Sequence, residues 1–147
     1  MLLNILKKSQ WCYRHGLMRM GAFFEKLLIL TNSASISGQA EIGERVSFSH
    51  GGIGVIVHPR AKIGNDCLIG AGVVIGNRFP DAAAPKIGNN VYIGVGAKIL
   101  GEVTVGDNSM IGANAVVTHD VPEGCVAVGV PAKVVGKTKI TGLYRDI

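Results

Sequence analysis

The chain has 147 residues, with 15 Lys and Arg against 10 Asp and Glu and a formal net charge of +5. This length leaves room for one domain only. A hydrophobic content of 48% with 5% aromatic residues and 21 glycines excludes disorder and favours a repetitive aliphatic core. The basic residues are scattered and lack a set of stacking aromatic side chains, so nucleic acid is not expected as a partner. A phosphate-rich ligand, an acidic glycan or an anionic membrane surface fits the mild basic excess better.

The cysteines and the N-terminal segment indicate a cellular location. Cys12, Cys67 and Cys125 are widely spaced and form no CxxC pair, which predicts reduced thiols in a cytoplasmic protein and no metal site. The N-terminal segment is apolar, but charged residues interrupt it before it reaches the length of a membrane span. We therefore expect a soluble, cytoplasmic protein.

Residues 1–30 are predicted to be helical. Apolar residues such as Leu2, Leu6, Leu17, Phe24 and Leu28 fall mostly at three- and four-residue spacings, with the basic residues away from that stripe. The glycines at positions 16 and 21 are predicted to divide the segment into two helices. Two roles are open for these helices. They cap the open end of the following domain or pack on a neighbouring subunit, or they rest on the inner face of a membrane as a basic amphipathic surface.

A six-residue repeat dominates residues 31–136. Ile36, Ile42 and Phe48 begin it, and a branched aliphatic residue then returns at Val57, Ile63, Ile69, Ile75, Ile87, Ile93, Ile99, Val105, Ile111 and Val117. This period fits neither an amphipathic helix nor a simple alternating strand. It predicts a parallel β-helix, in which three hexapeptides complete one coil and coils stack at about 4.8 Å. Residues 137–147 are predicted to form a polar C-terminal tail.

Two segments break the repeat. The spacing from Phe48 to Val57 is nine, which predicts an extra loop at Ser49–Gly54. A second loop is predicted at residues 77–86, which contain Pro80 and Pro85. Loops on a rigid scaffold often carry functional sites. The second loop lies about one and a half coils beyond His50 in the sequence, and we expect it to overhang the same cleft.

The repeats and the closing segment Gly129–Gly136 resemble the hexapeptide-repeat acyltransferases. Within that group, the segments Ser49–Gly52 and His58–Gly64 resemble the serine acetyltransferases and the polysaccharide O-acetyltransferases of the colanic acid type. The resemblance implies a left-handed β-helix, a homotrimer and acetyl-CoA as co-substrate. The predicted fold class is therefore all-β, a left-handed parallel β-helix with an N-terminal α-helical segment.

The resemblance also implies a set of site residues. His50 matches the catalytic histidine of the serine acetyltransferase motif, and an imidazole with an ordinary pKa near 6.5 is suited to deprotonate a hydroxyl. Ser49, Gly51 and His58 are predicted to contact the acceptor. The coenzyme A positions carried over from the family are Gly94, Gly96, Ala97, Gly112 and Ala113, with Lys133 near the nucleotide phosphates.

Three departures from the serine acetyltransferase pattern bear on the acceptor. Ser49 stands where that family has an Asp before the catalytic His, Ser35 stands where it has an orienting Asp, and Ala83-Ala84 replace an Arg-His pair. A zwitterionic amino acid needs charged partners for both of its ends. We therefore expect a sugar hydroxyl of capsular, exopolysaccharide or lipopolysaccharide biosynthesis as the acceptor, with L-serine as the alternative.

The departures leave two further questions open. His50 lacks its usual carboxylate unless Glu41, Glu44 or a neighbouring subunit supplies one. A non-catalytic scaffold is the second alternative function, and a metal-binding version of it needs a third histidine beside His50 and His58.

Overall fold

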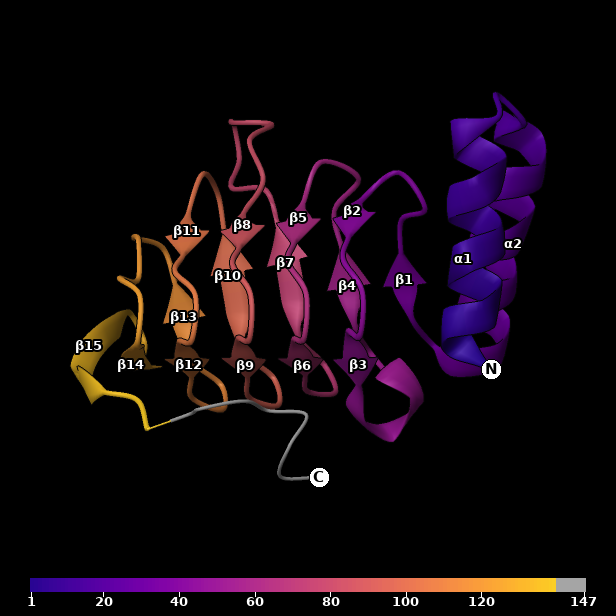
Figure 1. Ribbon diagram of the computed structural model, residues 1–147. Helices are drawn as coiled ribbons and strands as arrows, with labels where there is room; N and C mark the ends of the chain where they lie inside the picture. The colour runs from indigo at the N-terminus through magenta and orange to yellow at the C-terminus, as the bar shows by residue number, and fades with distance from the viewer. Residues whose placement is uncertain (140–147) are drawn as a thin grey trace.

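The computed structural model describes residues 1–139 and consists of a helical pair followed by a β-helix (Figure 1). The pair comprises α1 (Leu2–Arg14) and α2 (Met18–Asn32). The break between them includes Gly16, which has φ 75°. The predicted division into two helices is confirmed, but Gly21, which was expected to help form the break, lies inside α2 and is buried. A Cβ there would come within 2.7 Å of the Tyr13 ring, so Gly21 serves close packing between the helices.

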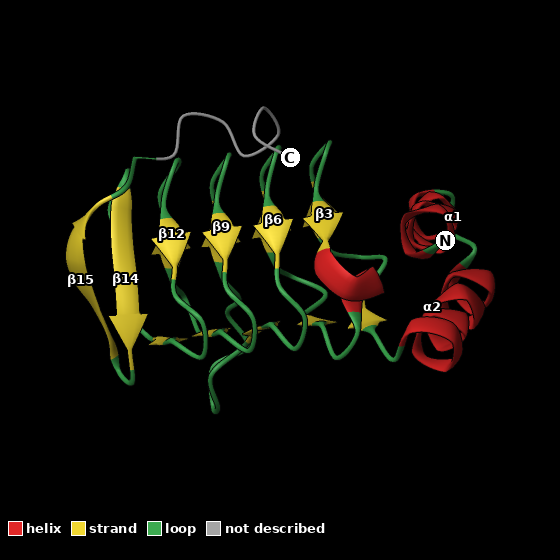
Figure 2. Cartoon of the chain, turned by 90° about the horizontal axis from the view of Figure 1, so that it is seen from below, coloured by secondary structure: helices red, strands yellow, loops and turns green. Residues whose placement is uncertain are grey.

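The strands form three sheets, one for each side of the prism (Figures 1 and 2). Sheet A contains β1 (Ser35–Ile36), β4 (Ile56–Val57), β7 (Val74–Gly76), β10 (Lys98–Leu100) and β13 (Val116–Val117). Sheet B contains β2 (Glu41–Ile42), β5 (Lys62–Ile63), β8 (Lys86–Ile87) and β11 (Thr104–Val105). Sheet C contains β3 (Ser47–Phe48), β6 (Leu68–Ile69), β9 (Tyr92–Ile93), β12 (Met110–Ile111), β14 (Cys125–Gly129) and β15 (Ala132–Lys137). Successive coils pair in parallel, which confirms the predicted β-helix.

The aliphatic residue of each hexapeptide points into the prism and stacks on its counterpart in the next coil. On sheet C, the register aligns Ile69 with Ile93 and Ile93 with Ile111. All three side chains are 0% exposed. Burial of such a side chain stabilises the fold by about 1.5–3 kcal/mol, so the ladders account for the period of six.

The far end of the prism is closed by a hairpin. Val121 bridges to Val105 in the last coil. The strands β14 and β15 then pair antiparallel, which ends the run of parallel strands in sheet C (Figure 2). The N-terminal end is covered by the helices, which are bonded to the first coil. The Gln10 side-chain amide donates to the Ala40 carbonyl at 3.3 Å, and the Glu25 carboxylate accepts from the Gly38 N–H at 2.8 Å.

Glycine is needed at coil corners where backbones approach closely. A Cβ at Gly70 would lie 2.6 Å from the Val95 backbone nitrogen, whereas one at Gly136 would meet nothing within 4 Å. We expect Gly70→Ala to destabilise the protein by about 1–3 kcal/mol because the corner cannot yield without moving backbone. Thermal unfolding should show a lower Tm for Gly70→Ala and an unchanged Tm for Gly136→Ala. Equal Tm values would contradict the packing described here.

Candidate functional site

His50 occupies a strained turn at the corner between sheets C and A. The strand β3 ends at Phe48, and residues Ser49–Gly52 form a short 3-10 turn (Figure 2). Inside it, His50 has φ 51° and ψ 36°, and Gly51 has φ 68° and ψ 17°. The left-handed conformation costs a non-glycine residue about 1–2 kcal/mol. Such strain persists only where the surroundings hold it, and it is common at functional sites.

Ser49, the residue before His50, is hydrogen-bonded to the next coil. The Ser49 hydroxyl accepts the Ala71 N–H at 3.1 Å and lies 3.4 Å from the Ile69 carbonyl, to which it donates. Ser49 therefore fixes one side of the turn, and its predicted contact with the acceptor remains a prediction. The His50 side chain is exposed and makes no hydrogen bond to any residue between 1 and 139.

The corner that begins at His50 continues along the prism, one coil after another. We call residues 49–54, 70–72, 94–96 and 112–114 the His50 edge. Backbone hydrogen bonds connect its coils, from Gly72 N–H to Ile53 C=O (2.8 Å), Gly96 N–H to Ala71 C=O (2.8 Å) and Asn114 N–H to Val95 C=O (2.9 Å). Four predicted coenzyme A positions lie on this edge, namely Gly94, Gly96, Gly112 and Ala113. The fold thus aligns them with the predicted base.

The other two predicted coenzyme A residues differ in setting. Ala97 is 0% exposed, so its side chain belongs to the core and only its backbone lies near the edge. Lys133 is exposed on β15, where it pairs with Val128. Val128 in turn packs against Gly112, since a Cβ on that glycine would come within 2.7 Å of the valine Cγ1. Lys133 therefore lies beyond the last coil of the His50 edge.

Two predicted elements lie at another corner. His58 follows β4 and precedes β5, so it stands between sheets A and B. Its Nδ1 accepts the Arg60 N–H at 3.2 Å, which leaves Nε2 as the donor of the neutral ring. The loop of residues 77–85 also leaves the prism between these sheets, after β7, and Figure 1 shows it on the opposite side from the turn after β3. The expectation that it overhangs His50 is wrong within one chain.

No carboxylate contacts His50 in the described part of the chain. Glu41 on sheet B pairs with Lys62 at 2.9 Å, and Glu44 lies 3.6 Å from Arg45. Neither of the proposed orienting carboxylates reaches the His50 turn. The Ser35 hydroxyl, in the matched place of the family's Asp, lies on sheet A.

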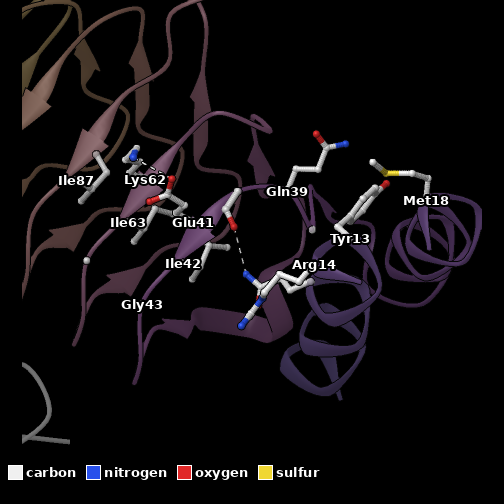
Figure 3. A pocket seen from close by; sticks show the side chains of 14 residues that line it. Tyr13, Arg14, Met18, Gln39, Glu41, Ile42, Gly43, Lys62, Ile63 and Ile87 are labelled. Carbon is white, nitrogen blue, oxygen red and sulfur yellow. Dashed lines mark hydrogen bonds and ion pairs between the residues drawn. The ribbon is translucent and has the colours of Figure 1, made fainter. Parts of the chain in front are cut away.

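Two of the hollows that adjoin the helices lie against sheets B and A, and His50 lines neither of them. One of about 750 Å³ lies between α1 and sheet B, where Tyr13 and Arg14 face Gln39 and Ile42 (Figure 3). The other, of about 400 Å³, lies on the outer face of sheet A and is lined by His58 and Glu25. His50 itself is exposed in the single chain. Residues 1–139 contain no group of three or more His, Cys, Asp or Glu side chains that could hold a metal ion.

Cys67 illustrates how strongly the prism buries its small inward side chains. Burial raises the pKa of this thiol to about 11. Below the ordinary thiol pKa of 9.0, the thiol is neutral in both states and the stability of the fold is fully present. As the pH rises from 9.0 through 11, the unfolded state loses this proton first, so stability is lost. We expect Cys67 to resist a disulfide reagent at pH 8 in the folded protein and to react after unfolding. Rapid modification of the native protein at this residue would contradict the burial.

Comparisons with known proteins agree with the hexapeptide coils. A family model described as "Bacterial transferase hexapeptide (six repeats)" matches residues 84–119, and one described as "Hexapeptide repeat of succinyl-transferase" matches residues 60–77. The serine acetyltransferase of Helicobacter pylori strain J99 is 38% identical over 137 residues, covering 87% of this chain and 80% of that protein. That of Synechococcus elongatus is 34% identical, covering 90% of this chain and 54% of that protein.

Solved structures give the same result. Serine acetyltransferase of Brucella abortus strain S19 in complex with coenzyme A superposes with a TM-score of 0.91 at 29% identity, over 95% of this chain and 56% of that one. Soybean serine acetyltransferase complexed with serine gives 0.86 at 32% identity, over 91% and 56%. The fold and its repeats define a hexapeptide β-helix protein. The chain belongs to the hexapeptide-repeat acyltransferases and is related to the serine acetyltransferases, although it spans only about half the length of several of these relatives.

Proposed function

We propose that the protein is an O-acetyltransferase that uses acetyl-CoA, with His50 as the general base. The observation that carries this proposal is the position of His50 at one end of an edge built mostly from small residues. The imidazole takes the proton of the acceptor hydroxyl as its oxygen attacks the thioester carbonyl. The C–S bond then breaks, the acetyl group stays on the oxygen, and the sulfur of coenzyme A receives the proton from the imidazolium. Proton transfer of this kind contributes a factor of about 10²–10⁴ in rate.

The His50 edge suits the arm of coenzyme A. Beyond His50, side chains along it are small or apolar, as at Ala71, Val95 and Ala113, with Asn114 as the exception, so an extended pantetheine chain can lie close to the backbone. Lys133 lies beyond the last coil and offers a point charge for phosphate. Lys98 also reaches this edge, because its Nζ donates to the Gly96 carbonyl at 2.9 Å. The complex of the Brucella relative with coenzyme A supports coenzyme A as the ligand.

Lys133 provides a test of the coenzyme orientation. We expect Lys133→Ala to raise the Kd for coenzyme A about 3- to 30-fold, since a charge-assisted contact with phosphate is lost. The Kd for a pantetheine fragment without phosphates should not change. Lys86→Ala, on the outer face of sheet B, is the matched control and should bind like the unaltered chain. Calorimetric titration measures these Kd values for the unaltered chain and for both variants. An unchanged Kd of Lys133→Ala for coenzyme A would overturn this placement.

For the acceptor, the comparisons favour L-serine over the sugar hydroxyl that the sequence analysis preferred. The relatives carry the serine acetyltransferase name, and one solved relative is complexed with serine. We therefore propose L-serine as the first acceptor to test. A sugar hydroxyl is the second candidate because no carboxylate of residues 1–139 contacts His50 and Ser49 replaces an acidic residue.

An acceptor panel separates these candidates. The protein, acetyl-CoA and either L-serine or a set of neutral sugars are incubated, and the acetylated product is identified by mass. Product with L-serine alone supports the first acceptor, and product with a sugar alone supports the second. No product with any acceptor would leave the non-catalytic scaffold as the better account.

We also propose a homotrimer, on the character of the prism faces. The outward side chains of sheet A are mostly apolar, namely Ile56, Val74, Leu100 and Val116 beside Ser35 and Lys98, and those of sheet C include Leu68, Tyr92, Met110 and Val126 beside Ser47. Sheet B instead presents Glu41, Lys62, Lys86 and Thr104. The two apolar faces meet at the His50 edge, so packing of three copies through them would enclose that edge. Light scattering after gel filtration should give three times the chain mass, and a monomer at micromolar concentration would refute the proposal.

A cytoplasmic location is proposed, with membrane contact through the helices as a separate alternative. No helix within residues 1–139 is both long and apolar enough to cross a bilayer. The side chains of Phe23 and Leu30 on α2 are 62% and 82% exposed, near the basic residues Arg19 and Lys26 in sequence. Such a surface suits an anionic bilayer. Flotation with anionic and with neutral vesicles tests it, and absence from both floated fractions would exclude contact with bilayers of these compositions.

A further inference from the structure

The His50 turn is held from the side of the helices as well as from the next coil. Asn32, the last residue of α2, donates from its Nδ2 to the Gly51 carbonyl at 3.0 Å. The two residues are 19 apart in sequence. A carbonyl can only accept a hydrogen bond, so this contact also fixes which end of the Asn32 amide faces Gly51.

Other contacts make the end of α2 a rigid support. Ser33 takes the left-handed conformation that ends the helix, with its N–H bonded to the Ile29 carbonyl at 3.0 Å. Its own carbonyl accepts the Gly54 N–H at 2.9 Å. On the other side, Leu2 of α1 packs over Gly52 so closely that a Cβ there would lie 2.5 Å from its Cδ1.

These contacts matter because no side chain within residues 1–139 orients the imidazole. The ring makes no hydrogen bond within residues 1–139, and the matched position of the orienting carboxylate is Ser35. Its direction is then set by the backbone at His50 and Gly51, both left-handed. The hydrogen bond of the Ser49 hydroxyl holds the backbone before His50, and the Asn32 amide holds the backbone after it, at the Gly51 carbonyl.

We propose that Asn32 is a positioning residue for the reaction, which acts on His50 by holding the Gly51 carbonyl. This inference rests on the proposed function for its effect on turnover, although the contact itself is independent of it. A small misplacement of a catalytic group can cost about 10²-fold in rate. The helical pair thus contributes to the site as well as covering the prism.

Two variants separate a hydrogen bond from space filling. Asn32→Ala removes the amide, and Asn32→Asp keeps its shape but presents an acceptor to the Gly51 carbonyl. We expect both to lower kcat about 10- to 100-fold while the KM for acetyl-CoA stays the same. Asn4→Ala, an exposed amide on α1, is the control and should keep the original kcat. A role in packing alone predicts that Asn32→Asp behaves like the unaltered chain.

A second readout does not depend on turnover. The Cε1–H resonance of His50, assigned by its loss in His50→Asn, should be a single sharp line in the unaltered chain. It should shift or broaden in Asn32→Asp, while the other His resonances and the Tm are retained. An unchanged His50 line overturns the inference whether or not the protein is active. If the line changes in a protein that acetylates no acceptor, the positioning contact stands and the proposed function fails. If turnover exists and both Asn32 variants keep kcat, the inference is wrong.

Discussion

Replacing His50 by Asn is expected to lower kcat for acetyl transfer by about 10²–10⁴, the range that general base catalysis contributes. Asn is chosen because, among non-glycine residues, it tolerates the left-handed conformation of this turn best. The loss would therefore report the missing base and not a broken corner. The Kd for coenzyme A should stay unchanged, since the arm is proposed to bind along the backbone of the edge.

The matched control for this experiment is His119→Asn. His119 is exposed and its ring lies beside the Thr118 hydroxyl at 3.1 Å, away from the His50 edge. Its replacement should leave kcat and Kd at their original values. Retention of full activity in His50→Asn would show that another group takes the proton and would remove the basis of the proposed mechanism.

Replacing Ile93 by Asp is expected to unfold the prism, with a loss above about 4 kcal/mol. Ile93 is 0% exposed and stacks between Ile69 and Ile111, so a carboxylate there would be buried without a partner. Ile93→Val removes one methylene and should cost only about 0.5–1.5 kcal/mol. Circular dichroism and denaturant unfolding measure both variants.

Lys86→Asp is the control for the charge itself. Lys86 points outward from β8, directly before the buried Ile87. An aspartate at this position stays in water, so the Tm should change little. If Ile93→Asp folded as stably as Lys86→Asp, the inward orientation of the ladder would be wrong.

The sequence predicted the prism because its signal is periodic. Each inward position repeats a buried aliphatic side chain, and residues such as Ile93 and Ile111 fall at the same place in successive coils. The same regularity placed Gly94 and Gly112 one coil apart, at one corner. The hairpin of β14 and β15 was predicted only as a closing segment, since it departs from the repeat.

The positions of His58 and of the second loop were harder to predict. His58 lies eight positions after His50, which is more than one hexapeptide. Because each hexapeptide advances the chain by a third of a coil, His58 falls at the next corner of the prism. A count of coils that ignores which of the three corners a residue occupies suggested that residues 77–86 overhang His50. The structure places the loop between sheets A and B instead.

The contact between Asn32 and Gly51 could not be predicted from the repeat. Asn32 lies in the helical segment, outside the hexapeptides, and a polar residue at a helix end usually has a local role. Only the way the helices pack on the first coil brings its amide to the His50 turn. The same packing buries Gly52 against Leu2.

The most direct test of the central claim is a crystal structure of the protein with coenzyme A bound. The account predicts the sulfur about 3–3.5 Å from the His50 ring, within reach for reaction. The pantetheine arm should follow residues 70–72, 94–96 and 112–114, with the phosphates towards Lys133. Coenzyme A bound in the hollow between α1 and sheet B, or with its sulfur far from His50, would contradict it.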